Sequence, residues 1–178
     1  MSQADDLSIS LRRIIGDLAL RARFSTWEAL MKEIRTEIEI DVPVNEVWSI
    51  LTDFARHPAW NPFIREISGE LRQGAQLQVS LGPPGKRAMK FKPIVQMLEP
   101  GKTFRWLGHL LFPGLFDGEH IFELEAAGEN GTRFIQREKF HGILVGLFRK
   151  SLDTDIKNGF IAMNEALKKE VEESSYKI

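Results

Sequence analysis

The sequence predicts an α+β fold in which a curved antiparallel sheet of about six to seven strands wraps around one long C-terminal helix. Three observations predict it: period-two alternation from residue 64 to 141, helical periodicity from 143 to 172, and short turns rich in glycine and proline between the strands. Strands joined by short turns are antiparallel, and strands kept apart from helices favour α+β over α/β. A chain of 178 residues fits one such domain.

The composition excludes several classes of function. With 43% hydrophobic and 28% charged residues the chain resembles a globule with a core, and its net charge of −1 gives no support for nucleic-acid binding. The absence of cysteine excludes disulfides, thiolate metal sites and cysteine nucleophiles. No segment approaches the ~20 apolar residues of a membrane span, and no secretory leader is visible, so we expect a cytoplasmic protein.

Residues 7 to 34 show the spacing of an amphipathic helix, with arginines between the apolar positions and a break expected near Phe24. We therefore divide the chain into an N-terminal helical extension (1–32), a ligand-binding domain (33–173) and a tail (174–178). The extension is expected to dock its apolar stripe on its own domain or on a second copy of the chain in a homodimer; binding to a membrane surface or to another partner is the alternative. The apolar positions are Leu7, Leu11, Ile14, Ile15, Leu18, Phe24, Trp27, Leu30, Met31 and Ile34.

A half-buried strand is predicted at 35–44, followed by a short helix that Pro43 introduces. The next segment, 53–63, reads DFARHPAWNPF and cannot be one regular helix. Pro58 and Pro62 fix their own φ and disfavour the α region for His57 and Asn61. The segment is also too apolar for an ordinary solvent-exposed loop, so other parts of the chain must cover it.

The remaining strands are predicted at 64–71, 75–81, 88–100, 102–110, 118–127 and 131–140, the last after an Asn130–Gly131 hairpin turn. Pro93 requires a bulge or an edge position within its strand. The Gly- and Pro-rich segment 82–87 is expected to form a hairpin loop at the mouth of a cavity. The apolar loop 110–116 could gate that cavity, contact a membrane or pack on the N-terminal helix, and we favour packing.

A continuous apolar stripe predicts one helix over residues 143–172, about 45 Å long at 1.5 Å per residue. Only the sheet offers a surface of that length. Because the sheet is curved and the helix nearly straight, we expect a cavity between them. The stripe comprises Leu144, Phe148, Leu152, Ile156, Phe160, Met163, Leu167 and Val171.

The segment 42–67, VPVNEVWSILTDFARHPAWNPFIREI, carries a resemblance to a known family. With the strand order and terminal helix that follow, it resembles the START/polyketide-cyclase (SRPBCC) superfamily over about residues 33–172. That resemblance implies the helix-grip fold. Because the superfamily includes lipid carriers, hormone receptors, cyclases and hydrolases, it does not by itself select a function.

Alternation in the strands and the stripe of the helix predict which side chains face the cavity. Trp60 is expected at the cavity rim or wall, with a simple core plug as the alternative. The predicted ligand-binding set is Trp60, Phe63, Phe104, Trp106, His120, Phe122, Phe134, Gln136, Glu138, Phe140, Leu144, Phe148, Leu152 and Ile156.

The predicted interior has three polar groups, His120, Gln136 and Glu138, in an apolar lining. That composition is typical of a site for a small hydrophobic molecule, such as a lipid, a polyketide-like compound or an aromatic metabolite. A buried Glu138 should have a raised pKa, which a nearby His120 could offset. The alternatives are a cyclase- or dehydratase-like enzyme using Glu138 or His120 as acid or base, and an accessory protein acting through its N-terminal helix. No metal or cofactor motif appears.

Overall fold

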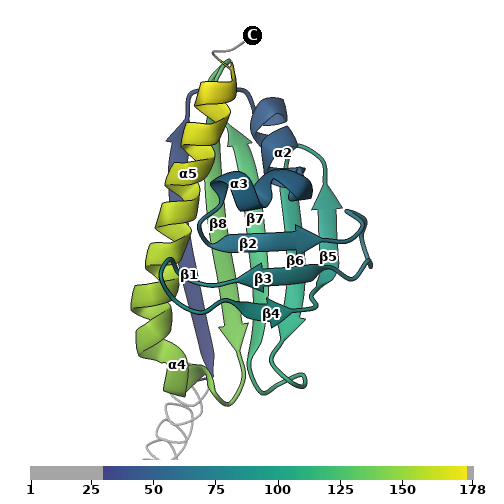
Figure 1. Cartoon of the computed structure of the whole chain (residues 1–178), viewed down its shortest axis with the longest axis vertical. Helices are drawn as coiled ribbons and strands as arrows, with labels where there is room; N and C mark the ends of the chain where they lie inside the picture. The colour runs from purple at the N-terminus through teal and green to yellow at the C-terminus, as the bar shows by residue number, and fades with distance from the viewer. Residues whose placement is uncertain (1–29, 176–178) are drawn as a thin grey trace, which may run out of the picture.

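A computed structural model describes residues 30–175; residues 7–29 of the helix predicted at 7–34, and the last three residues, lie outside them. Five strands form one antiparallel sheet in the order β1-β8-β7-β6-β5, and three form a second in the order β2-β3-β4. The predicted α+β architecture with its long C-terminal helix is confirmed (Figure 1). The strands are β1 (Met31–Ile40), β2 (Ile64–Ser68), β3 (Gln78–Leu81), β4 (Met89–Phe91), β5 (Ile94–Glu99), β6 (Thr103–His109), β7 (Asp117–Ala126) and β8 (Thr132–His141).

Strand β1 begins earlier than predicted. Residues 31–34, assigned to the N-terminal helix from their spacing, belong to β1 and pair with β8, Met31 opposite His141 and Ile34 opposite Glu138. The helical prediction was wrong there because pairing with a long neighbouring strand outweighs local periodicity.

Pro93 accounts for the eighth strand. The strand predicted at 88–100 is divided at Pro93 into β4 and β5, which belong to different sheets. The carbonyl of Pro93 accepts a hydrogen bond from the Leu77 N–H at 2.9 Å, and Gln76 forms a bridge with Ile94. These contacts connect the two sheets where the three-stranded sheet crosses in front of the five-stranded one (Figure 1).

Three short helical segments connect β1 to β2: α2 (Val44–Thr52), a 3-10 turn (Phe54–Arg56) and α3 (His57–Trp60). Asn61 is extended, as predicted, but His57 is α-helical with φ −49° and ψ −45°. The prediction for His57 was wrong because tertiary contacts outweigh the preference set by the following proline. Its buried imidazole is within 2.8 Å of the Leu51 carbonyl and 3.2 Å of the Asn61 amide nitrogen.

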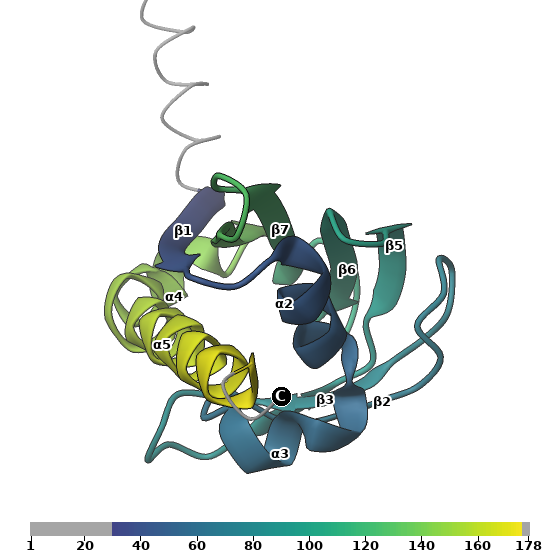
Figure 2. The same ribbon diagram turned by 90° about the horizontal axis from the view of Figure 1, so that it is seen from above.

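The C-terminal helix is continuous but not uniform. It runs from α4 (Val145–Ser151) through a π-helical segment (Leu152–Ile156) into α5 (Lys157–Ser175). Figure 2 shows α5 on one side of the molecule, with β2 and β3 below it and α2 facing it.

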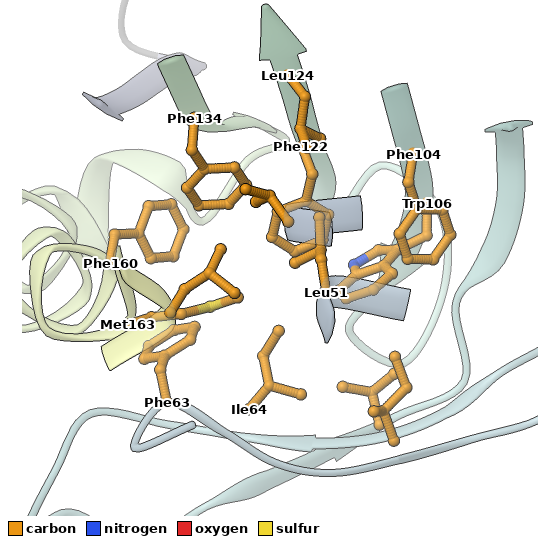
Figure 3. Close-up of a cluster of buried hydrophobic side chains, with 14 of the residues drawn as sticks. Leu51, Phe63, Ile64, Phe104, Trp106, Phe122, Leu124, Phe134, Phe160 and Met163 are labelled. Carbon is orange, nitrogen blue, oxygen red and sulfur yellow. The ribbon is translucent and has the colours of Figure 1, made fainter. Parts of the chain in front are cut away.

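Aromatic and aliphatic side chains fill the space between α5 and the sheets. Phe63 and Phe160 meet edge to face with ring centroids 5.2 Å apart, and Phe122 stacks parallel to Phe134 at 6.1 Å. Figure 3 shows these rings converging with Met163 of α5. All are at most 1% exposed, so this part of the interior is filled by side chains.

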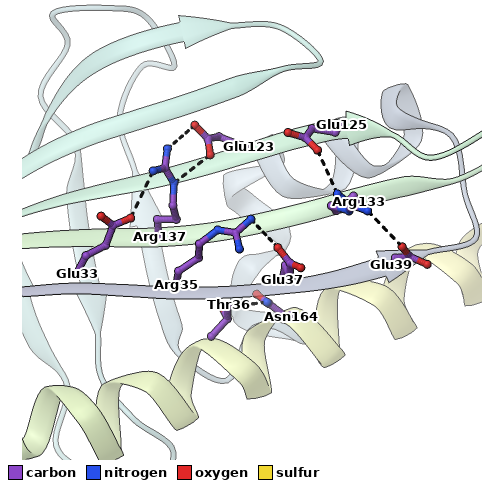
Figure 4. Close-up of polar contacts among 10 residues, drawn as sticks. All are labelled: Glu33, Arg35, Thr36, Glu37, Glu39, Glu123, Glu125, Arg133, Arg137 and Asn164. Carbon is purple, nitrogen blue, oxygen red and sulfur yellow. Dashed lines mark hydrogen bonds and ion pairs between the residues drawn. The ribbon is translucent and has the colours of Figure 1, made fainter.

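The opposite face of the five-stranded sheet carries rows of alternating charge (Figure 4). Arg137 donates two hydrogen bonds to the carboxylate of Glu123, at 2.7 and 3.0 Å, and a third to Glu33 at 3.3 Å. These pairs make the outer face polar, so the inner face is the side on which the core and any ligand site must lie.

A close contact in the filled region yields a stability prediction. A Cβ atom at Gly159 would lie 2.4 Å from the ring of Phe63, which is fully buried and held against Phe160. Glycine to alanine in a helix normally stabilises by about 1 kcal/mol. Here we expect Gly159→Ala to lower the free energy of unfolding by about 1–3 kcal/mol through overpacking.

Chemical denaturation of Gly159→Ala beside Asn158→Ala, at the neighbouring exposed position of α5, measures this effect. Asn158→Ala should leave stability unchanged or raise it, because alanine is the better helix former. An equal gain in both variants would show that Phe63 does not constrain α5.

Candidate functional site

A pocket of about 250 Å³ lies between the inner face of β6, β7 and β8, the start of the C-terminal helix and the three-stranded sheet. Its lining is almost entirely apolar, and among residues 30–175 Glu138 contributes the one carboxyl group in it. The lining residues are Phe63, Val79, Leu81, Gly82, Pro83, Arg87, Met89, Phe91, Pro93, Trp106, Gly108, Leu110, Phe116, Gly118, Glu138, Phe140, Phe148, Ser151, Leu152 and Ile156.

Two glycines form part of the pocket wall. Gly108 of β6 lies opposite Gly118 of β7, so neighbouring strands both lack a side chain at this level of the sheet. A Cβ atom at Gly118 would lie 2.5 Å from Oε1 of Glu138, whereas one at Gly108 would meet only Pro93, at 3.7 Å. The glycine at 118 therefore makes room for the carboxyl group, and the glycine at 108 leaves room in the pocket.

The pocket occupies only one end of the space that the sequence predicted to be empty. Of the predicted ligand-binding residues, half line it: Phe63, Trp106, Glu138, Phe140, Phe148, Leu152 and Ile156. The other half lie outside its lining: Trp60, Phe104, His120, Phe122, Phe134, Gln136 and Leu144. Most of the second group pack beneath α5, where large aromatic side chains occupy the space.

The π-helical segment provides the helical wall of the pocket. Leu152 and Ile156, its first and last residues, both line the pocket. A π-helical turn contains an extra residue, which shifts the direction of the side chains that follow. The segment also carries Asp155, whose carboxylate lies 4.0 Å from the ammonium of Lys86 in the 82–87 loop. Both groups are largely exposed, so this ion pair across the pocket rim is weak.

Gly82, Pro83 and Arg87 place the 82–87 loop at the pocket, as the sequence predicted. Arg65 of β2 holds the loop in place by donating hydrogen bonds to the carbonyls of Pro83 at 3.1 Å and Lys86 at 2.6 Å.

Glu138, His120 and Trp106 lie side by side on β8, β7 and β6 because the three residues are in register. Oε2 of Glu138 is 3.8 Å from Nδ1 of His120, too far for a direct hydrogen bond. On its other side, His120 Nε2 is 2.9 Å from the amide nitrogen of Gln136. The ring of His120 is fully buried between those of Trp106 and Phe160. It lies beside Glu138 in the sheet but is not part of the pocket lining.

Burial determines the ionisation of this pair. It raises the pKa of Glu138 from 4.5 to about 8 and lowers the pKa of His120 from 6.5 to about 3. The expected rise for Glu138 is present, but its cause is loss of hydration, and no compensating charge comes from His120 because that ring is also neutral. At neutral pH the pocket therefore contains a protonated carboxyl group that can donate a hydrogen bond.

Trp60 does not line the pocket. Its indole packs against the imidazole of His57, with ring centroids 4.9 Å apart, and its Nε1 is buried without a hydrogen-bond partner. The neighbouring Asn61 accepts hydrogen bonds from the N–H groups of Phe63 and Ile64, at 2.9 and 2.8 Å. The aromatic segment 53–63 therefore closes the end of the core around α2 and directs Phe63 toward the pocket.

The loop 110–116 borders the pocket through Leu110 and Phe116 and is held by Asp117. The buried carboxylate of Asp117 accepts a hydrogen bond from the Gly114 N–H at 2.8 Å and contacts His109 at 2.7 Å. Burial alone would raise the pKa of Asp117, but these hydrogen bonds lower it below its usual value. Its stabilising effect is therefore present above pH 3.8 and is lost as the pH falls through the lowered value.

The contribution of the three-stranded sheet was not predicted from the sequence. Val79, Leu81, Met89 and Phe91 line the pocket from β3 and β4. Alternation marked these strands but could not show that they cross the larger sheet rather than extend it. Gly108 and Gly118 were also not predicted, because glycine has no side chain that alternation could assign to a face. They form part of the wall because they lie opposite each other in the sheet.

Within residues 30–175 no group of three or more His, Asp or Glu side chains is arranged to hold a metal ion. In the same range, no helix is both long and apolar enough to cross a membrane.

Residues 31–172 match the model of a family described as polyketide cyclase / dehydrase and lipid transport. No curated protein matches the chain. Among solved structures, the Zhui aromatase/cyclase of a Streptomyces species is 15% identical, with a TM-score of 0.65 over 80% of this chain and 94% of that one. A Thalictrum flavum norcoclaurine synthase is also 15% identical, with a TM-score of 0.63 over 82% and 97%. A protein of Thermus thermophilus is 18% identical, with a TM-score of 0.64 over 81% and 99%. At these identities the likeness establishes the fold.

The shifted pKa values predict how stability depends on pH. Between about pH 6.5 and 8 the unfolded chain has Glu138 ionised and His120 neutral, while the folded chain keeps Glu138 protonated. The folded state thus binds one more proton, and stability should fall as the pH rises, by at most about 1.4 kcal/mol per pH unit.

Denaturation curves of the wild type and Glu138→Gln at several pH values in this window test the assignment. The stability of the variant should not show this fall, so the free energy of unfolding of the variant relative to the wild type should increase as the pH rises to about 8. Parallel pH profiles for the two proteins would show that Glu138 does not change its ionisation on folding in this range.

Proposed function

We propose that this chain, which belongs to the polyketide cyclase / dehydrase and lipid transport family, binds a small, mainly apolar molecule in the pocket beside Glu138. The observation that carries the proposal is a pocket whose lining is apolar except for a few polar groups, of which the Glu138 side chain is only 14% exposed. Such a combination gives affinity through apolar burial and orientation through a small number of hydrogen bonds.

The dimensions restrict the ligand. A cavity of about 250 Å³ lies just below the range of about 300–1,000 Å³ typical of small-molecule sites. Six aromatic side chains are among its lining residues: Phe63, Phe91, Trp106, Phe116, Phe140 and Phe148. A compact molecule with one or two rings, or a short branched chain, fits this space, and aromatic groups can pack against these rings.

The ionisation of the pocket restricts the ligand further. Because Glu138 is protonated at neutral pH, it donates a hydrogen bond to an uncharged oxygen, such as a carbonyl or hydroxyl. Ionising it against an apolar wall would cost free energy, and no cation in the described chain is paired with it. Arg87 at the rim is exposed and can meet a polar group that points out of the pocket.

Within the predicted ligand-binding set, we assign ligand contact to the seven residues that line the pocket. Phe104, Phe122 and Phe134 instead belong to the filled core, where Gln136 contacts His120 at 2.9 Å.

Filling the pocket tests the proposal. Leucine at Gly108 would extend into the pocket with no initial clash, since a Cβ atom there has only Pro93 as a neighbour, at 3.7 Å. We expect Gly108→Leu to remain folded and to lose a ligand that copurifies with the wild type, measured by native mass spectrometry followed by denaturing extraction. Gly108→Ala, which adds one methyl group, is the matched control and should retain most of it.

The same molecule retained at equal occupancy in wild type, Gly108→Ala and Gly108→Leu would place its binding elsewhere. Suppose instead that the folded wild type yields no ligand and binds a hydrophobic dye no better than Gly108→Leu does. That result would argue against binding in this pocket.

A second candidate function is catalysis of a cyclase- or dehydratase-like reaction with Glu138 as general acid. The observation that favours it is a carboxyl group with a pKa of about 8 facing an apolar pocket, since an acid is most effective when its pKa lies near the working pH. Protonation by Glu138 of a carbonyl or a departing hydroxyl would be its role, and His120 would act on it indirectly.

For a substrate that the wild type converts, we expect Glu138→Gln to lower kcat by about 100-fold or more, because glutamine keeps the shape but cannot release a proton. KM should change far less. Turnover that is unaffected by Glu138→Gln would leave the pocket as a binding site without this acid.

A further inference from the structure

The end of the molecule around α4 exposes an apolar patch. Its members are Met31, Leu111, Phe112, Ile143, Leu147 and Phe148, which we call the α4-end patch. Leu111 is 85% exposed, Leu147 75% and Ile143 68%. Single exposed apolar residues are ordinary on a protein surface, but a continuous group of them marks a surface that another structure covers.

Hydrogen bonds show that the three segments of the patch lie together. The N–H of Ile143 donates to the Gly114 carbonyl at 3.2 Å, joining the loop after β8 to the 110–116 loop. Leu147 lies in the first turn of α4, which begins two residues after Ile143. Met31 is paired with His141 at the start of β1 and its carbonyl accepts a hydrogen bond from Arg149 of α4.

One residue of the patch has an unusual backbone. Leu111 has a φ of 65°, which is uncommon for a residue with a side chain, and its side chain points out of the fold. The loop therefore exposes a leucine side chain at a cost in backbone energy. The hydrogen bond from the Gly114 N–H to Asp117 helps to hold the loop in this conformation.

The chain enters the described fold at this patch. The carbonyl of Leu30 accepts a hydrogen bond from the Gly142 N–H at 3.0 Å, next to Ile143. Residues 1–29 therefore join the domain at the edge of the exposed surface. Their apolar residues recur at helical spacing from Leu7 to Trp27, which predicts an apolar stripe that itself needs a partner.

We propose that residues 7–29 of the same chain lie on the α4-end patch. The segment is long enough, since about 23 helical residues extend about 35 Å. Its attachment at Leu30 holds it at an effective concentration in the millimolar range, well above that of a separate partner. Over residues 1–29 four arginines are matched by three aspartates and one glutamate, so this part of the chain lacks the excess positive charge that draws a helix to anionic lipid.

This docking would also border the ligand pocket. Phe148 belongs to both the patch and the pocket lining, and Phe116 of the lining packs edge to face on Phe148 with ring centroids 5.2 Å apart. The segment would cover the outer side of this aromatic pair. The proposal does not depend on the pocket's ligand and can be tested without one.

Cysteine labelling of the full chain tests the proposal, because the protein contains no cysteine of its own. Leu147→Cys and, as a control, Lys169→Cys each introduce one thiol at a position whose own side chain is about three-quarters exposed in the described residues. We expect a maleimide to react with Leu147→Cys at least ~10-fold more slowly than with Lys169→Cys, because the segment must open first. Adding Leu11→Asp and Leu18→Asp should restore the faster rate.

Three results would overturn the proposal. Equal labelling rates in the two variants would show that the patch is uncovered. Protection that grows with protein concentration, together with a dimer in light scattering, would assign the cover to a second copy. Protection that appears only with vesicles of neutral and anionic phospholipids would assign it to a membrane surface.

Discussion

The removal of one carboxyl group from water is the interaction on which the pocket depends. Glu138 lies on the inner face of the sheet, near a pair of facing glycines, and shares the pocket lining with Leu152 and Ile156 of the π-helical segment. Neither a cation nor a close hydrogen bond within the described residues offsets its burial, so the group stays protonated. The wall thereby combines a large apolar surface with a protonated carboxyl group, and this combination restricts what can bind there.

The C-terminal helix separates a filled region from an open one. In the filled region Gly159 allows the ring of Phe63 to pack directly on the helix backbone, and Phe122 and Phe134 complete the layer. In the open region the π-helical segment places Leu152 and Ile156 at the pocket, opposite Gly108 and Gly118. The three glycines therefore have different consequences: Gly159 admits the ring of Phe63, Gly118 admits the carboxyl group of Glu138, and Gly108 leaves space in the pocket.

Most of the fold could be predicted from the sequence because strand alternation and the helical stripe are local patterns. The burial of His120, Phe122 and Gln136 also followed from alternation. Alternation could not predict that these three residues lie outside the pocket lining, because that depends on how the large side chains pack beneath α5. Pairing of residues 31–34 with β8 and the crossing of β3 and β4 over the larger sheet arise from contacts distant in sequence. No local pattern encodes them.

The most direct test of this account is infrared difference spectroscopy of the wild type against Glu138→Gln during a pH titration. The account predicts a protonated carboxyl band at neutral pH that is absent from the variant and disappears with a midpoint near pH 8. A carboxylate already present in mildly acidic solution, with a midpoint near the ordinary value of 4.5, would show that water reaches the group and would contradict it.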